Sequence, residues 1–308
     1  MRVISKVTEL HQWRAKTRSQ NKTVGFVPTM GALHQGHFSL VEAAKSKCDV
    51  VAVSIFVNPS QFAPHEDYDN YPRDLESDLK KLEPYYQNVQ DDDDFIVFAP
   101  SVEEMYPRGI TLDIERQIGG FVEIRGLSLQ LEGVTRPHFF RGVATVVTKL
   151  FCAVQPDLAF FGQKDIQQCF VVRALVEDLI MFPMKVVIVP TQRDPKTGLA
   201  LSSRNVYLTD DERDNLAPMF YKGLKDAVAA YENKNERSAE KLLALVRNRA
   251  EKEGGLNIEY ISLIEPDTLE PVVGNVGEKG AILCGAWRIG AARLIDNVLL
   301  GIPLMPKD

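Results

Sequence analysis

The sequence has few cysteines, no excess of positive charge and no long apolar run, and each absence removes a class of protein. Its 4 cysteines lie far apart, and no pair has the spacing of a metal site, so we expect reduced residues rather than a disulfide framework. The net charge of -6 argues against a nucleic-acid groove, which usually needs a basic face. No apolar run has the length of a membrane span, and the N-terminus lacks an apolar secretory core. We therefore expect a cytoplasmic protein that binds neither nucleic acid nor a membrane.

The N-terminal segment leaves one alternative open. Its basic residues outnumber its acids, which is also typical of an organellar leader. Its apolar residues Val7, Leu10 and Trp13 recur at helical spacing, however, and we favour an amphipathic first helix.

The first two thirds of the chain alternate between short apolar runs and helix-period segments. The chain has 308 residues, of which 45% are hydrophobic and 25% charged, which suits a globular protein of about two domains. The apolar runs are residues 24–27, 50–57, 95–98, 158–161 and 185–189, and the helical segments are residues 38–44, 74–82, 143–154 and 166–179. Nearly continuous apolar runs are typical of parallel strands covered on both faces. The pattern predicts an α/β fold with a Rossmann-like doubly wound parallel sheet.

The pattern changes after Pro190. Residues 210–253 predict two charged helices, which begin at a good N-terminal cap around Thr209. Strand-like runs follow at residues 258–264, 281–286 and 291–300. We expect a first domain of residues 1–191 and a second, smaller α+β domain of residues 192–308 with antiparallel strands. Residues 111–131 predict an irregular or β excursion, and the acidic run 91–94 a solvated loop before a strand rather than a metal site.

The segment Pro-Thr-Met-Gly-Ala-Leu-His-Gln-Gly-His at residues 28–37 is the most informative motif. It follows the first apolar run and precedes a helical segment. A strand that ends in a glycine-containing turn and opens into a helix offers free N–H groups and a positive dipole end, which together bind anions. His34 and His37 can donate hydrogen bonds to phosphate oxygens and to the charge that develops during transfer. The motif therefore predicts phosphate chemistry on a nucleotide.

Two further polar clusters follow predicted strands, and each could also be an ordinary turn or cap. Asn58 and Gln61 come after the second run, where their amides could bind a polar substrate. Lys164 after the fourth run offers a point charge for a phosphate or carboxylate. Asp165 could bind a ribose hydroxyl or cap the next helix. Carboxyl ends of parallel strands share one edge of a sheet, so the clusters are expected at a common site.

The segment after the expected domain boundary also suits a polyphosphate. Ser202 and Ser203 offer hydroxyls beside the planar donor fork of Arg204, although a turn with a structural salt bridge is the alternative. The turn-rich residues 194–198 before it are expected to act as a closing flap. Asp78 becomes a candidate ligand only if Mg²⁺ accompanies a triphosphate.

Together these segments resemble the pantoate–β-alanine ligase family of the nucleotidylyltransferase superfamily, which carries a His-x-Gly-His signature. The similarity covers most of residues 24–205 in order and spacing, and continues weakly at residues 258–264 and 294–297. It implies ATP-dependent condensation of pantoate with β-alanine to pantothenate through an enzyme-bound pantoyl adenylate, with release of AMP and pyrophosphate. It also implies Mg²⁺ and a homodimer.

The resemblance implies a role for each matching residue. The residues implied in ATP binding are Pro28, Thr29, Met30, His34, Gly36, His37, Gly162, Lys164, Asp165, Leu201, Ser202, Ser203 and Arg204. Those among them with an implied catalytic role are His34, His37, Lys164, Ser203 and Arg204. The implied pantoate pocket consists of Met30, Asn58, Gln61, Tyr71 and Gln168, and Asp78 is the implied Mg²⁺ ligand.

The chain departs from the family pattern in two places. The family commonly has Arg-Pro-Gly-His-Phe where this chain has Arg-Pro-His-Phe-Phe at residues 136–140, so His138 receives no role. The segment 85–93 is longer than the corresponding part of the family pattern.

The sequence also shows no residue that is an obvious base for the amine of β-alanine.

Two other functions remain as alternatives. One is a nucleotidylyltransferase that acts on another small acid or on a phosphorylated acceptor. The pair Gln61 and Gln168 argues against it, because two amides beside Lys164 suit a small hydroxy acid. The other is a nucleotide-binding regulatory protein without activity. The complete set of expected phosphate-binding residues argues against that alternative.

Overall fold

The chain forms two compact units, which are described separately. The computed structural model describes residues 1–64, 66, 68–87, 89, 91–181, 183–253 and 255–303. Unit 1 comprises Met1–Gly162 and Gln167–Val189, and unit 2 comprises Gln163–Ile166 and Pro190–Asp308. Among the helices of the described residues, none combines the length and the apolar character that crossing a membrane requires.

Unit 1 contains a six-stranded sheet in the order β1-β4-β3-β2-β5-β6, and every neighbouring pair is parallel. The strands are β1 Arg2–Ile4, β2 Val24–Thr29, β3 Val50–Ile55, β4 Phe95–Phe98, β5 Leu158–Gly162 and β6 Lys185–Val189. Successive strands are added on one side of β2 as far as β4, and β5 then lies on its other side. Doubly wound sheets bind ligands outside the carboxyl ends of the strands at such a reversal. The predicted parallel sheet is confirmed.

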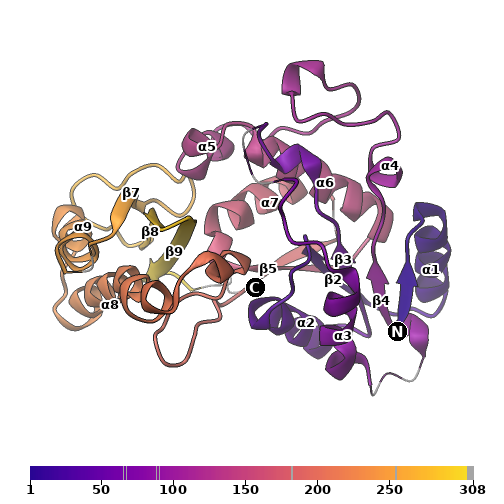
Figure 1. Ribbon diagram of the computed structural model, residues 1–308, viewed down its shortest axis with the longest axis horizontal. Coiled ribbons are helices and arrows are strands. Elements are labelled where there is room, and N and C mark those ends of the chain that lie inside the picture. Colours follow the sequence, from indigo (N-terminus) through magenta and orange to yellow (C-terminus); the bar gives the residue numbers. More distant parts are fainter. Residues whose placement is uncertain are drawn as a thin grey trace. The chain divides into compact units, whose positions relative to one another are not determined.

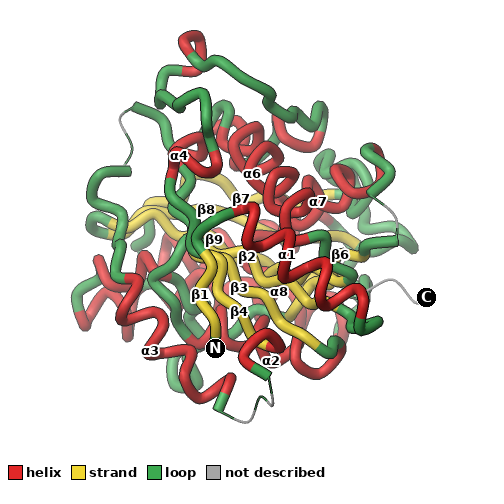
Figure 2. The backbone as a smooth tube through the Cα atoms, turned by 90° about the vertical axis from the view of Figure 1, so that its right-hand side faces the viewer, coloured by secondary structure: helices red, strands yellow, loops and turns green. Residues whose placement is uncertain are grey.

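Helices cover both faces of this sheet (Figures 1 and 2). Helices α2 (Gln35–Lys47) and α3 (Leu75–Tyr86) lie on one face, and α1 (Val7–Ser19), α6 (Phe139–Val154) and α7 (Ile166–Asp178) on the other. Two short helices, α4 (Val102–Met105) and α5 (Glu132–Thr135), lie in the connection between β4 and α6. The predicted first helix is correct, because α1 buries Leu10 and Trp13. Apolar side chains on both faces of the strands make burial the main force that holds the layers together.

Two features of unit 1 differ from the sequence prediction or decide between its alternatives. Strand β1 was not predicted, because its three residues are too few to show an alternation. Residues 111–131, all of them described, contain the 3-10 turns Ile114–Arg116 and Leu127–Leu129 and no strand. The irregular alternative is therefore the correct one.

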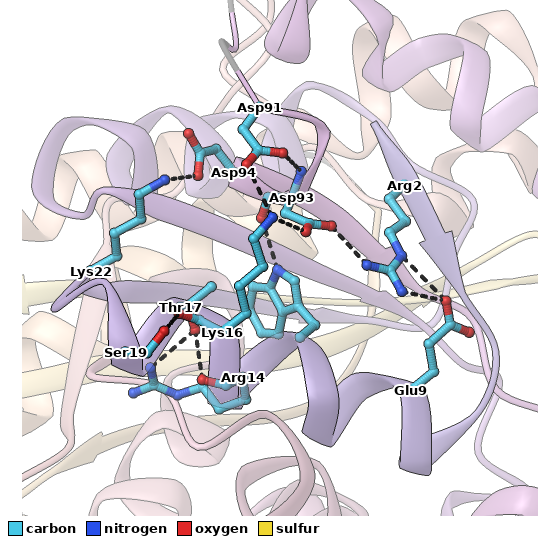
Figure 3. A network of polar contacts seen from close by, with 11 residues as sticks. Arg2, Glu9, Arg14, Lys16, Thr17, Ser19, Lys22, Asp91, Asp93 and Asp94 are labelled. Carbon is cyan, nitrogen blue, oxygen red and sulfur yellow. Dashed lines mark hydrogen bonds and ion pairs between the residues drawn. The ribbon is translucent and has the colours of Figure 1, made fainter.

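The acidic run at residues 91–94 is ion-paired rather than simply solvated (Figure 3). Lys16 contacts Asp91 at 3.2 Å and Asp93 at 2.6 Å, and Arg2 contacts Asp93 at 2.9 Å. The Asp93 side chain is only 13% exposed. Burial raises its pKa, but the hydrogen bonds from Lys16 and Arg2 outweigh burial and leave the pKa below its ordinary value. The longer segment 85–93, of which residues 88 and 90 lie outside the described part, thus ends in aspartates that are ion-paired with Lys16 of α1.

Unit 2 pairs two helices with a small antiparallel sheet, as predicted. The helices are α8 (Pro218–Asn233) and α9 (Ala239–Arg247), and the strands are β7 (Asn257–Ile264), β8 (Ala281–Ile289) and β9 (Ala292–Leu300), in the order β7-β8-β9. At the expected cap, Thr209 and Glu212 form a capping box, since Thr209 N donates to Glu212 Oε2 at 2.9 Å and Glu212 N donates to Thr209 Oγ1 at 3.3 Å. Phe220 of α8 stacks on Trp287 of β8 with ring centroids 4.2 Å apart, at the centre of the core.

Candidate functional site

The histidine motif occupies the loop between β2 and α2, at the carboxyl end of a central strand. Thr29 ends β2 and donates its hydroxyl to the carbonyl of Ser54 at 2.7 Å, which ties the loop to β3. Gly31 follows with φ of 84°, a left-handed conformation that glycine adopts without strain. The chain then reaches His34, which is the N-cap of α2. The motif therefore places its histidines at a helix N-terminus, where anions bind.

His34 and His37 cap the helix reciprocally. His34 Nδ1 accepts from the amide of Gly36 at 3.1 Å, and His37 Nδ1 accepts from the amide of His34 at 3.3 Å. The two ring centroids are 4.1 Å apart. Because Nδ1 is the acceptor in both rings, each neutral imidazole carries its proton on Nε2. The spacing of the motif thus fixes two rings side by side with Nε2–H as the donor of each.

Asp78, the residue implied as a Mg²⁺ ligand, holds this loop in place. The residue is 2% exposed. Its Oδ2 accepts from the amide of Ala32 and its Oδ1 from the amide of Leu33, both at 2.8 Å. Both carboxylate oxygens are thus used by backbone donors directly before His34. These bonds support a positioning role for Asp78, and the role of Mg²⁺ ligand that the family resemblance implies stays a prediction.

Asn58 and Gln61 lie together after β3, as their spacing suggested. Asn58 is 1% exposed, and its Nδ2 donates to Gln61 Oε1 at 2.9 Å. Its Oδ1 accepts from the hydroxyl of Tyr106 at 2.7 Å. Burial raises the pKa of Tyr106 to about 12, so this hydroxyl stays protonated and remains a donor. Asn58 therefore orients Gln61, and Gln61 Nε2 is left as the donor end of that amide.

The turn that carries Gln61 packs directly against α6. A Cβ on Gly142 would lie 2.1 Å from the carbonyl oxygen of Ser60, so only glycine permits this approach. Arg136 adds a second support, because its Nη2 donates to the carbonyl of Gln61 at 3.1 Å while its Nε contacts Glu66 at 2.6 Å. The main chain of the turn is thus held from two sides.

Other predicted pantoate residues differ in their surroundings. Gln167, which was not among the predicted residues, is 5% exposed and binds the backbone of residues 127, 130 and 132, so it is a structural residue. Gln168 next to it is half-buried. Tyr71 packs edge-on against Phe62 with centroids 5.6 Å apart. Met30 is half-buried in the loop that leads to the histidines.

Lys164 and Asp165 belong to unit 2, in the 3-10 turn Gln163–Asp165 that follows β5. Lys164 Nζ lies 3.3 Å from Asp165 Oδ1, and its side chain is 18% exposed. Gly162 ends β5, and a Cβ there would meet no heavy atom within 4 Å. The backbone is therefore open at this point, which is compatible with a ligand close to the main chain.

The Ser-Ser-Arg segment forms a 3-10 turn in unit 2. Ser202 is its N-cap and accepts from the amide of Arg204 at 3.3 Å. The side chains of Leu201, Ser202, Ser203 and Arg204 are all half-buried. The preceding residues 194–198 form a tight turn in which Asp194 Oδ1 accepts from the amides of Lys196 and Thr197. Those amide bonds lower the pKa of Asp194, that of Thr197 most. A closing motion of this turn remains a prediction.

No role was predicted from the sequence for Tyr106, for Gly142 or for the buried polar residues of β9, although residues 294–297 belong to the segments that resemble the family. A partner of each lies far away in the sequence, as in the 48 residues between Asn58 and Tyr106. The described residues also contain no group of three or more His, Cys, Asp or Glu side chains that could hold a metal ion.

Comparisons with known proteins agree with this arrangement. The family model described as pantoate-beta-alanine ligase matches residues 2–299. The pantothenate synthetase of Thermotoga neapolitana is 47% identical over 98% of this chain and 100% of its own. That of Chloroflexus aggregans is 48% identical over 97% of this chain and 100% of its own.

Solved structures give the same result. The crystal structure of pantothenate synthetase from Thermus thermophilus has a TM-score of 0.83 at 42% identity, covering 98% of this chain and 100% of that chain. The pantoate-beta-alanine ligase of Francisella tularensis, complexed with beta-gamma ATP and beta-alanine, has a TM-score of 0.71 at 32% identity, covering 99% and 100%. This chain therefore belongs to the pantoate–β-alanine ligase family.

Proposed function

We propose that this chain condenses pantoate with β-alanine to pantothenate, using ATP and releasing AMP and pyrophosphate. Membership of the ligase family supports the reaction. The observation that carries the chemistry is the pair of imidazoles that cap α2, with ring centroids 4.1 Å apart at the carboxyl end of β2. Two adjacent Nε2 donors beside a helix N-terminus suit a transferring phosphate better than any neutral ligand.

The reaction has two steps. A carboxylate oxygen of pantoate attacks the α-phosphorus of ATP, and the bond to pyrophosphate breaks. The amine of β-alanine then attacks the carboxyl carbon of the enzyme-bound pantoyl adenylate, and AMP leaves. His34 and His37 donate to phosphate oxygens as negative charge shifts toward the leaving group, and the protein otherwise positions the reactants.

We assign pantoate to the amides of Gln61 and Gln168, with Met30, Asn58 and Tyr71 around them. The hydrogen bond from Asn58 to Gln61 Oε1 supports this assignment, because it leaves Gln61 Nε2 to donate to a substrate hydroxyl or carboxylate. Asn58 itself acts by orienting Gln61, since its amide group is saturated inside the protein.

The remaining assignments concern ATP. The residues of unit 1 assigned to it are Pro28, Thr29, Met30, His34, Gly36, His37 and Gly162. Those of unit 2 are Lys164, Asp165, Leu201, Ser202, Ser203 and Arg204. Mg²⁺ would enter with ATP, because it is usually bound through substrate phosphates, waters and only one or two carboxylates of the protein. The cytoplasmic location, the homodimer and the roles of residues 1–191 as the ATP and pantoate domain and 192–308 as a lid remain predictions.

The decisive experiment is exchange of labelled pyrophosphate into ATP by the purified protein. We expect exchange only when pantoate is present, and pantothenate only when β-alanine is also added. Exchange that runs equally well without pantoate would refute the proposal. A panel of other small acids and phosphorylated acceptors in the same assay tests the alternative of a nucleotidylyltransferase with a different substrate.

The histidines give a second test. Replacing either His34 or His37 with alanine should lower kcat by about 100- to 1,000-fold, the range for loss of one donor to a developing negative charge. If both variants kept the kcat of the wild type, the assigned role would be wrong.

A further inference from the structure

Two buried polar residues of β9, Asp296 and Asn297, are not used in the proposed reaction. They are 2% and 1% exposed, in a strand whose other buried residues are apolar. Burying a carboxylate and an amide costs free energy unless each finds hydrogen-bond partners. Neighbouring residues of a strand point to opposite faces, so the two side chains serve different segments.

Asn297 holds the turn that carries Lys164. Its Nδ2 donates to the carbonyl of Gln163 at 2.9 Å and to the carbonyl of Lys164 at 3.0 Å. Its Oδ1 accepts from Gln163 Nε2 at 3.1 Å. One amide group thus binds two successive carbonyls and a side chain of the same turn. These bonds explain why residues 163–166 form part of unit 2, although they lie between β5 and α7 in sequence.

Asp296 holds the arm that leads to the Ser-Ser-Arg turn. Its two oxygens accept from Arg193 Nη1 at 2.6 Å and Nη2 at 2.8 Å, which is a bidentate pair. The guanidinium lies 3.6 Å from the centroid of the Tyr221 ring. Arg193 also pairs with Ala200 through a β-bridge, directly before Leu201. A displaced Arg193 would therefore move the start of the Ser-Ser-Arg turn.

We infer that Asn297 and Asp296 are positioning residues for phosphate transfer, acting through Lys164 and through Ser203 and Arg204 respectively. The inference rests on the proposed function and adds to it. If these two positions contributed only to stability, apolar side chains of the same shape would do as well, because buried ion pairs and amides seldom stabilise a fold more than such residues do. The two polar residues instead fix the main chain of both phosphate-binding segments of unit 2.

The test is a double-mutant cycle between Asn297 and Lys164. Asn297→Leu keeps the approximate shape and removes all three bonds, and we expect kcat of pantoate-dependent pyrophosphate exchange to fall about 10- to 100-fold, as for a small misplacement of a catalytic group. KM for pantoate should stay within about twofold, because Gln61 and Gln168 belong to unit 1. In the Lys164→Ala background, Asn297→Leu should lower kcat by less than about threefold, because the side chain that Asn297 positions is already absent.

Two further variants separate positioning from stability. Asn297→Ser keeps a small polar side chain that can donate to only one of the two carbonyls, and it carries the test if the leucine variant fails to fold. Leu283→Ala opens a cavity at a fully buried position of β8 and serves as the matched control. It should lower the midpoint of thermal unfolding while kcat stays within about threefold at 25 °C.

The outcomes distinguish the inference from the function on which it rests. The wild type alone tests the function, since its exchange must depend on pantoate. An Asn297 variant that keeps kcat within threefold would overturn the inference. So would a loss that is equally large with and without Lys164, because that result would mean a general structural effect.

Discussion

Replacing Asp78 with asparagine should destabilise the histidine loop without changing the requirement for Mg²⁺. The wild-type carboxylate accepts one backbone hydrogen bond on each oxygen, from Ala32 and from Leu33, each at 2.8 Å. Asparagine has the same shape but only one oxygen, so its NH₂ group must face one of these N–H donors. The substitution therefore removes one bond and leaves one buried amide without an acceptor.

The expected cost follows from these two effects. A hydrogen bond to a charged group is worth about 1.5–3 kcal/mol, and an unsatisfied buried donor costs about 1–3 kcal/mol. Because the two ranges partly describe the same loss, we expect the free energy of unfolding to fall by about 3 kcal/mol. The displaced loop leads directly to His34, so kcat should fall by about 10- to 100-fold as the imidazoles lose their alignment.

The assay combines urea unfolding, followed by circular dichroism, with a Mg²⁺ titration of pyrophosphate exchange. Glu76→Gln is the matched control, because it removes the same charge from an exposed position in the first turn of α3. The control should unfold within about 0.5 kcal/mol of the wild type, as is usual for surface substitutions. The Mg²⁺ concentration for half-maximal activity should be equal in all three proteins.

One result would refute this reasoning. If Asp78→Asn unfolded like the control and needed about ten times more Mg²⁺, the carboxylate would be an ion ligand, and its bonds to the loop would contribute nothing measurable.

Three further predictions concern unit 1. Gly142→Ala should force the turn that holds Gln61 to move by about 1 Å, because its Cβ would lie 2.1 Å from a backbone oxygen, and KM for pantoate should rise. The control Gly120→Ala, whose Cβ would meet nothing within 4 Å, should behave as wild type. His138→Gly should stabilise unit 1 by about 1 kcal/mol in urea unfolding, because His138 is exposed and has φ of 73°, a left-handed conformation that strains residues with a Cβ. Asp93→Asn should destabilise at pH 7, since the pKa of Asp93 is lowered in the fold; the difference from wild type should shrink below about pH 4, as the wild-type carboxyl is protonated too. An effect of Asp93→Asn that was equal at pH 7 and pH 3 would contradict the role of its ion pairs.

The sequence predicted the parts of the fold in which local pattern and burial agree. Strands β4 and β6 have the predicted bounds Phe95–Phe98 and Lys185–Val189, and the other apolar runs of unit 1 end within two residues of their strands. Those runs are buried on both faces of the sheet, so nearly all of their residues are apolar and the runs can be recognised in the sequence. Strand β1 could not be predicted, because its pairing with β4 rather than its own sequence pattern makes it a strand.

Only the local part of the candidate site could be predicted from the sequence. The spacing of His34 and His37 is local, and the two rings meet because both lie in the first turn of α2. The supports of the site are not local. Asp78 lies 45 residues from the amide of Leu33, and Asn297 lies 133 residues from the carbonyl of Lys164. A single sequence without its fold contains no signal for such pairs, so the bonds from Asp78 to the loop could not be predicted.

A common arrangement unites these supports. Three of the segments proposed to contact substrates are each held by a polar side chain that is almost completely buried. Asp78 holds the loop before His34, Asn58 holds the amide of Gln61, and Asn297 holds the turn of Lys164.

Rigid loops could in principle be built from apolar packing alone, but apolar contacts do not fix direction. A hydrogen bond to a named backbone atom does, because it weakens steeply away from linear geometry. Phosphate transfer between positioned reactants depends on such alignment more than on any reactive side chain. We therefore expect apolar replacements at these three buried positions to lower kcat as well as stability, whereas cavities in either core should lower stability with little change in kcat.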